Sequence, residues 1–297
     1  MFRCINYMLL ILVFLTTEVV CADIVVTDSA GREVRLSHPA TRIIALAPHI
    51  TENIYSAGAG KYLVGVVNHS DYPEQAKDIT VVGGFSSFSV ERILALKPDL
   101  VMAWSSGNDD KRIQQLIQLG IHVYIDEPHV LNDIALSVNN IGVLAATEHI
   151  AEPAARQFLL NVEHLHNQYA HKSPVSVLYQ VWDSPLQTLN GEHIISNGIE
   201  ICGGENSYAS ALSIAPNISI ESVIERNPDM IVASGMGEER PEWLDSWKKW
   251  TALKAVRQNN LYFIPPDLIQ RHTFRMIQGI SMMCDFIDRV RQKDGPA

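Results

Sequence analysis

Two glutamates stand at matching places in a phrase that the chain contains twice. The first copy, SVERILALKPDLVMAW, covers Ser89–Trp104, and the second, SIESVIERNPDMIVAS, begins 130 positions later at Ser219. Glu91 and Glu221 each follow the serine of their copy by two places. Because matched charges fix the register of a complex and speed its formation, this pair predicts docking onto a two-fold partner with two basic patches. Taken singly, each glutamate is also explained as a first-turn charge that the helix dipole favours.

Each copy also has the pattern of a short helix that leads into a buried strand. The serine is a good N-cap, the Pro-Asp pair ends the helix, and an apolar run follows. The repeat therefore predicts two lobes of similar construction, with one glutamate on each.

The sequence lacks the usual motifs of catalysis and metal binding. It has no nucleophile elbow, Walker A loop or paired-histidine zinc motif. His164 and His166 are two positions apart, a spacing that does not share a helical face, so we interpret the histidines around them as a solvated polar surface. We expect no catalytic residue and no metal site. That group comprises His149, His164, His166 and His171.

Length and charge narrow the class of protein. The chain has 297 residues, enough for two domains. Its net charge of −10 gives no electrostatic footprint for nucleic acid.

The first 22 residues have the pattern of a cleaved signal peptide. Arg3 precedes the apolar run MLLILVFL, and Val20 and Ala22 occupy positions −3 and −1 of a cleavage site. A membrane anchor needs about 20 apolar residues, and Glu18 interrupts this run. Cys21 leaves lipidation as a minor alternative. We therefore predict export to the periplasm.

Two cysteines remain after cleavage, Cys202 and Cys284. An even number of cysteines in an oxidising compartment favours a disulfide. Two buried thiols are the alternative.

The rest of the chain alternates short β-branched runs with helical stretches, which predicts mainly parallel sheets covered on both faces. The stretch 152–171 has helical spacing, opens with Pro153 in a first turn, and predicts a stiff rod between the lobes. A ligand site is expected in the cleft between them. The expected divisions are an exposed N-terminal hairpin (23–41), an N-terminal lobe (42–148), a linking helix (149–172) and a C-terminal lobe (173–297).

The pattern SDYP…ERILALKPDLVMAW…CGGEN…NPDMIVASG…RHTFR, with ALAPHITENIYSAGAG, resembles the helical-backbone metal-chelate binding proteins of ABC importers, specifically their cobalamin-binding branch. The resemblance runs from about Thr41 to Val290. It implies two Rossmann-like lobes bridged by one long helix, little hinge motion, and a ligand between the lobes. It also implies that Glu91 and Glu221 meet arginines on the two permease subunits.

The resemblance also assigns ligand-binding positions. Trp104 keeps the residue type of an aromatic wall, and Asp267 and Arg271 match a polar pair that contacts amide or nucleotide-loop groups. A local i,i+4 salt bridge is the alternative for that pair. His69 replaces a usual tyrosine and either approaches the corrin edge or an axial site on cobalt, or is a surface histidine. Phe85 replaces a usual tryptophan.

Two further positions complete the expected pocket. Ala215 stands where the resembled branch has an aromatic residue. Trp182, beside Asp183, follows a predicted strand end, where ligand loops occur in open α/β sheets; core packing is the alternative for its indole.

We therefore expect a monomeric periplasmic protein that captures cobalamin, or a related corrinoid, and delivers it to an ABC permease dimer, with no further cofactor. A ferric siderophore or haem is the alternative ligand. A secreted enzyme on the same scaffold is the alternative class.

Overall fold

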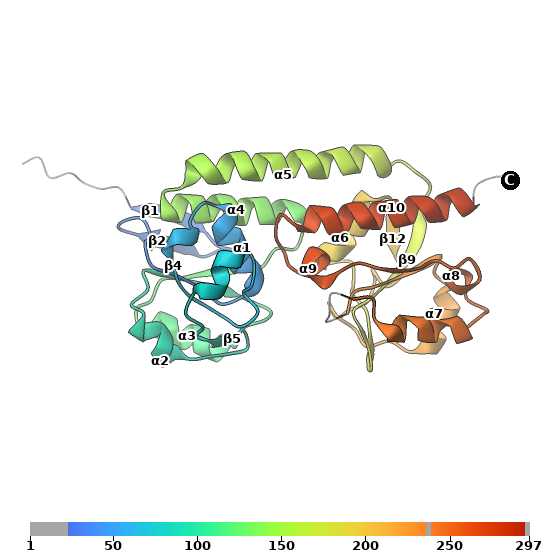
Figure 1. The fold of residues 1–297 in the computed structure, drawn as a ribbon, viewed down its shortest axis with the longest axis horizontal. Coiled ribbons are helices and arrows are strands. Elements are labelled where there is room, and N and C mark those ends of the chain that lie inside the picture. The colour runs from blue at the N-terminus through green and yellow to red at the C-terminus, as the bar shows by residue number, and fades with distance from the viewer. Residues whose placement is uncertain (1–22, 236–238, 295–297) are drawn as a thin grey trace, which may run out of the picture.

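The structure is a computed structural model that describes residues 23–235 and 239–294. These residues form two α/β lobes that lie side by side and are bridged by helices along one edge (Figure 1). The predicted fold class is confirmed. The predicted signal peptide, residues 1–22, lies outside the described residues. No helix in the described ranges is long and apolar enough to cross a bilayer.

The N-terminal lobe is built on a four-stranded parallel sheet of order β4-β3-β7-β8. Successive residues of its strands enter different cores: Ala45 and Met102 pack on one face, and Ile44 and Val101 on the other. Strands buried on both faces need continuous apolar runs, which the sequence supplies. The elements are β3 (Ile43–Ala45), α1 (Pro48–Ser56), η1 (Gly60–Tyr62), β4 (Leu63–Val66), η2 (Glu74–Asp78), β5 (Gly83–Gly84), β6 (Ser87–Phe88), α2 (Val90–Ala95), β7 (Leu100–Trp104), α3 (Asp110–Gln118) and β8 (Val123–Asp126).

The C-terminal lobe repeats this plan with a parallel sheet of order β12-β9-β13-β14. Tyr179 and Val232 face one core, and Leu178 and Ile231 face the other. The elements are β9 (Val175–Gln180), β10 (Trp182–Asp183), β11 (Leu186–Gln187), α6 (Ile194–Ile201), β12 (Gly204–Asn206), α7 (Ile220–Arg226), β13 (Met230–Ala233), η3 (Glu242–Lys249), α8 (Lys254–Arg257), β14 (Leu261–Phe263), α9 (Pro266–Ile269) and α10 (Met276–Asp294).

The repeated phrase has a structural basis in both lobes. Ser89 and Ser219 cap α2 and α7 by accepting backbone N–H bonds. Asp99 Oδ2 accepts from the backbone nitrogen of Arg42, just before β3, at 3.0 Å. Asp229 Oδ2 likewise accepts from the backbone nitrogen of Ser176 on β9 at 2.8 Å. Each aspartate thus ties its strand to the neighbouring strand.

The bridge between the lobes consists of two antiparallel helices, α4 (Leu131–Ala145) and α5 (Glu148–Tyr169). Figure 1 shows α5 lying across both lobes, with α4 beneath it on one side and α10 on the other. The rod was predicted, but its start was wrong: the helix begins at Glu148, so Pro153 lies inside it. The sequence pattern did not identify α4.

Helix α4 belongs to the cores of both lobes. Leu131 and Ile134, near its beginning, pack in the C-terminal core, whereas Val138 and Ile141 pack in the N-terminal core. Its first turn is also held by the C-terminal lobe, because Leu131 N–H donates to Asn197 Oδ1 at 3.0 Å. The two lobes therefore share a continuous apolar support.

The N-terminal hairpin, β1 (Ile24–Thr27) with β2 (Glu33–Leu36), forms as predicted. The expectation that it is exposed was wrong for one face. Val26, Val34 and Leu36 are buried in the N-terminal core, because alternate residues of a strand point to opposite sides.

Candidate functional site

A cavity of about 320 Å³ lies between the two lobes. Loops that follow β7 and β8 form one wall, and residues from β9, α6 and the chain after α9 form the other. These are carboxyl ends of parallel strands, where open α/β sheets bind ligands. The cavity is lined by Trp104, Ser106, Glu127, Pro128, His129, Tyr179, Val181, Leu189, His193, Ile194, Ile195, Ile214, Ala215, Gln270 and His272.

Aromatic rings gather at the N-terminal wall of the cavity. The Trp104 ring lies edge-on to that of His49, with centroids 5.2 Å apart, and 6.0 Å from that of Phe85. Asn108 fixes the backbone at both residues: its Oδ1 accepts from the backbone N–H of Trp104 at 2.6 Å, and its Nδ2 donates to the backbone carbonyl of Phe85 at 2.7 Å. The wall is therefore preorganised rather than assembled by a ligand.

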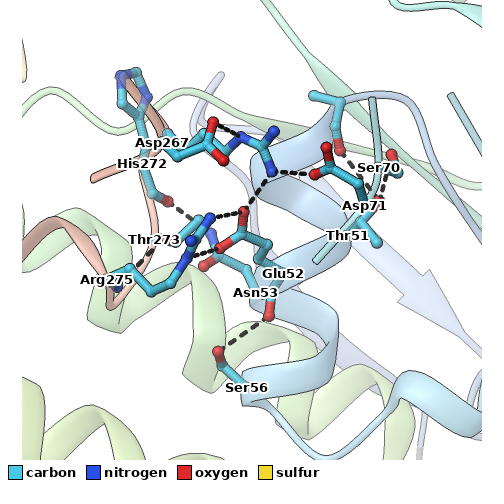
Figure 2. Close-up of polar contacts among 12 residues, drawn as sticks. Thr51, Glu52, Asn53, Ser56, Ser70, Asp71, Asp267, His272, Thr273 and Arg275 are labelled. Carbon is cyan, nitrogen blue, oxygen red and sulfur yellow. Dashed lines mark hydrogen bonds and ion pairs between the residues drawn. The ribbon is translucent and has the colours of Figure 1, made fainter. Parts of the chain in front are cut away.

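Beside the cavity, a cluster of ion pairs joins the lobes (Figure 2). Glu52 on α1 is 3% exposed and accepts from Arg271 Nη1 at 2.9 Å and from Arg275 Nη2 at 2.7 Å. Arg271 also pairs with Asp71 at 2.7 Å and with Asp267 at 3.1 Å. Three carboxylates thus surround one guanidinium at the junction of the lobes.

The close opposite charges shift the pKa values of Arg271 and Asp71. Burial lowers the pKa of Arg271, but hydrogen bonds to Asp71 and Glu52 and the charge of Asp267 outweigh it, so the pKa is raised. For Asp71, burial alone would raise the pKa, but the hydrogen bond and charge of Arg271 bring that pKa below its ordinary value. Both groups therefore stay ionised at neutral pH.

A second contact crosses the lobes beside the ion pairs. Asn53 Nδ2 donates to the His272 carbonyl at 2.9 Å. Figure 2 shows the His272 ring turned away from Glu52 and its arginines. The same backbone segment therefore carries a link between the lobes on one side and a cavity-lining ring on the other.

Some of the predicted ligand residues line the cavity, and others lie outside it. Trp104 lines the cavity, and Phe85 is 42% exposed beside it. Asp267 and Arg271 form the i,i+4 salt bridge that was the alternative to a ligand contact, and Arg271 also joins the ion pairs between the lobes. Ala215 lines the cavity.

His69 and Trp182 are not among the residues that line the cavity. His69 is an exposed residue after β4 with a positive φ of 65°. Trp182 is partly buried on β10, next to the lining residue Val181, and its Nε1 donates to the Ser184 carbonyl at 3.1 Å.

The two predicted docking glutamates are exposed in the first turns of α2 and α7. Figure 1 shows these helices on the side of the molecule away from α5, one on each lobe. Hydrogen bonds from the backbone and from Ser89 lower the pKa of Glu91, and the corresponding bonds with Ser219 lower that of Glu221. Both carboxylates are therefore charged at neutral pH.

The Cys202–Cys284 disulfide is present, with a bond of 2.01 Å across 82 positions. It joins the end of α6 to α10 in the core of the C-terminal lobe. The rod histidines, by contrast, are all exposed, as predicted: His149, His164, His166 and His171.

Sequence reasoning missed residues of the ion-pair cluster and of the cavity lining. Glu52, His193 and His272 come from distant parts of the chain, and Glu52 and Arg271 are 219 positions apart. The only signal was indirect: His272 and Arg275 lie in the RHTFR motif, and Glu52 in ALAPHITEN. In the described part of the chain, no group of three or more His, Cys, Asp or Glu side chains is arranged to hold a metal ion.

Two parallel-sheet lobes on a helical spine, with a cavity between them, define the class of solute-binding proteins. The family model described as periplasmic binding protein matches residues 43–268. The chain belongs to the periplasmic binding protein family.

Individual proteins and solved structures are similar to this chain over most of its length. The vitamin B12-binding protein of Vibrio campbellii is 37% identical over 255 residues, which cover 86% of this chain and 92% of that protein. The vitamin B12-binding protein of Vibrio cholerae is 34% identical over 256 residues, covering 86% and 91%. The crystal structure of BtuF of Vibrio cholerae, a periplasmic vitamin B12-binding protein, matches with a TM-score of 0.79 at 33% identity, covering 86% of this chain and 99% of that one. The haem-binding protein RhuT of Roseiflexus has a TM-score of 0.74 at 24% identity, covering 84% and 99%.

Proposed function

We propose that this chain is a periplasmic carrier that binds vitamin B12, or a closely related corrinoid, in the cavity between its lobes and delivers it to an ABC importer. The observation that carries the proposal is identity above 30% to vitamin B12-binding proteins over both lobes. The haem-binding structures share the fold at 24% identity or less.

The chemistry of the cavity supports a corrinoid. Such a ligand is broad and largely neutral, with amide arms, and suits apolar walls with a few polar anchors. Leu189, Ile194 and Ile195 supply apolar surface, and Gln270 and His193 supply polar groups. A corrinoid is larger than 320 Å³, so part of it lies across the open mouth.

We propose that the rim completes the ligand site. Trp104 and Phe85, whose ring planes are tilted by 48°, provide aromatic surface for the macrocycle. Asp267 and Arg271 lie next to the cavity residues Gln270 and His272 and bind amide or nucleotide-loop groups. Trp182 and His69 contact the parts of the ligand that extend beyond the cavity.

An anionic ferric siderophore is less suited to this site. Such ligands need several cationic side chains, and the residues found to line the cavity include no lysine or arginine. Arg271, at its edge, already pairs with three carboxylates. Haem carries two carboxylates, which would also need cationic partners that the cavity lining lacks.

The proposed partner is a two-fold permease. Glu91 and Glu221 are exposed in the first turns of α2 and α7, and these two helices lie on the same side of the molecule, one on each lobe (Figure 1). This arrangement suits two basic patches related by symmetry. The chain acts as a monomer after removal of residues 1–22, and it carries a ligand without catalysing a reaction on it.

Calorimetric titration with cyanocobalamin, haem and a ferric siderophore tests the proposal. We expect saturable one-to-one binding of cyanocobalamin and markedly weaker binding of the other two. No heat with cyanocobalamin at tens of micromolar, together with tight binding of haem or the siderophore, would overturn it.

A further inference from the structure

Three histidines line the cavity between the lobes: His129, which is exposed, His193, which is partly buried, and His272, which is buried. The rings of His193 and His272 have centroids 5.8 Å apart. His49 lies behind His272 at 5.4 Å, outside the lining. This concentration of imidazole in a mainly apolar cavity requires a physical explanation.

The hydrogen bond of His193 determines which ring nitrogen carries the proton and so which group faces a ligand. His193 Nδ1 accepts from the backbone N–H of Ile195 at 3.2 Å, which caps α6. In the neutral ring, the proton is then on Nε2. His193 therefore presents an N–H donor to a ligand and keeps no free lone pair for a metal.

His272 is different, because its ring has no protein partner at its buried nitrogen. The residue is 5% exposed and lines the cavity, and its Nδ1 is shut off from solvent without a hydrogen-bond partner in the described structure, so Nε2 is the ring nitrogen that can reach a ligand. Burying an unsatisfied polar atom costs about 1–3 kcal/mol, so the placement of this ring against the cavity requires an explanation.

His272 also remains uncharged. Burial lowers its pKa well below the ordinary value, and the neighbouring His49, His193 and His129 lower it further. A neutral imidazole has one N–H and one nitrogen lone pair, and imidazole nitrogen is a common ligand for transition metals.

We propose that His272 provides an axial nitrogen ligand to the metal of a bound corrinoid, and that the site prefers corrinoids whose axial position is exchangeable. This inference rests on the proposed function. A bare ion would need several protein ligands, whereas a corrinoid brings its own equatorial nitrogens and needs only one more. In the exchange, water leaves cobalt and the imidazole lone pair forms the new bond. The ring keeps its proton on the other nitrogen, and the oxidation state of cobalt is unchanged.

The geometry around His272 suits this role. Its ring lies edge-on to the Trp104 indole, with centroids 6.4 Å apart and planes at 85°. A macrocycle stacked on the indole would therefore lie nearly perpendicular to the imidazole plane, as an axial imidazole requires. The hydrogen bond from Asn53 to the His272 carbonyl fixes the backbone at this position.

The test is an absorbance titration of the untagged mature protein with aquocobalamin and with cyanocobalamin, whose cyanide is not displaced by imidazole. We expect one equivalent of aquocobalamin to shift to the spectrum of a nitrogen-coordinated cobalamin, and cyanocobalamin to bind without a shift. In His272→Gln, both should still bind, the shift should be lost, and the preference for aquocobalamin should fall at least about tenfold. His164→Gln, an exposed histidine, should retain the shift.

The possible results separate the two proposals. If both corrinoids bind the wild-type protein and aquocobalamin shows no shift, the axial ligand is refuted and the proposed function stands. A shift that survives in His272→Gln also refutes the role of His272. If neither corrinoid binds, the proposed function fails and this inference fails with it. Should His272→Gln not fold, His272→Asn takes its place in the same comparison, and a wild-type protein that shows no shift refutes the axial ligand in any case.

Discussion

Arg271, between α9 and α10, donates from Nη1 to Oε1 of Glu52 on α1 at 2.9 Å and so ties the two lobes together beside the cavity. Arg275 holds the same carboxylate through Nε and Nη2 at 2.8 and 2.7 Å. A carboxylate removed from water is tolerated only when it is paired and hydrogen-bonded, and Glu52 meets both conditions. Glu52 therefore adds a buried ionic link between the lobes to the apolar support that α4 gives both of them.

Replacing Glu52 by glutamine should destabilise the protein strongly, because Arg271 and Arg275 would lose their buried counter-charge. Breaking a buried ion pair on one side costs about 3–5 kcal/mol. Urea denaturation measures the change in the free energy of unfolding. Glu74→Gln, which removes an exposed pair with Lys77, should change it by less than about 1 kcal/mol. Equal urea midpoints for the two variants would show that the Glu52 cluster is not stabilising.

Removing the disulfide should lower stability through the unfolded state. A closed loop of 82 positions corresponds to about 4–5 kcal/mol in the chain-entropy model. The Cys202→Ala, Cys284→Ala double variant should therefore unfold at a lower urea concentration than the oxidised wild type. Wild type treated with reductant is the matched control and should behave like the variant. Identical unfolding of the oxidised and reduced proteins would contradict the expectation.

Acid should weaken the fold through His193. Burial, with the nearby His129, lowers the pKa of His193 to about 4, whereas an unfolded histidine titrates near pH 6.5. Between these values the unfolded chain binds more protons, so the free energy of unfolding falls as the pH drops from 6.5 toward 4. The contribution is at most about 3 kcal/mol.

His193→Asn isolates this effect, because asparagine retains an N-cap acceptor and does not titrate. We expect a smaller loss of stability between pH 6.5 and pH 4 in this variant, measured by urea denaturation across that range. His164→Asn, at an exposed site, should behave like wild type. If wild type and His193→Asn show the same dependence on pH, the histidine does not contribute.

The docking glutamates should affect transport and leave ligand binding unchanged. Both lie in exposed first turns outside the cavity lining. Glu91→Ala with Glu221→Ala should bind cyanocobalamin with wild-type affinity yet abolish uptake by a reconstituted importer. Glu225→Ala, an exposed change on the same helix as Glu221, serves as the control. Wild-type uptake by the double variant would remove the docking proposal.

Much of the fold follows from local chemistry that the sequence carries. The N-cap serines Ser89 and Ser219 and the aspartates Asp99 and Asp229 act within a few residues or on an adjacent strand, so their roles repeat wherever the phrase repeats. Continuous apolar runs identified the other parallel strands in the same way, but not β12 (Gly204–Asn206), which has no apolar run. The two remaining cysteines allowed only one pairing within the chain.

The features that the sequence did not reveal depend on long-range geometry. Helix α4 has no strong start signal at Val130, and its apolar residues serve two cores in turn, which weakens the periodicity of a single buried face. Pro153 suggested a helix start, although the preceding turn begins at Glu148. The meeting of Glu52 with Arg271, and of His49 with His272, arises only when the lobes are placed against each other.

Hydrogen exchange followed by mass spectrometry, with and without cyanocobalamin, tests the central claim of a corrinoid bound between the lobes most directly. We predict that the ligand slows exchange in segments from both walls of the cavity, around Trp104, His129, His193 and His272, and leaves the exposed face of α5 near His164 unchanged. Protection confined to one lobe or to the far side of α5, or no protection at a saturating concentration, would contradict the account.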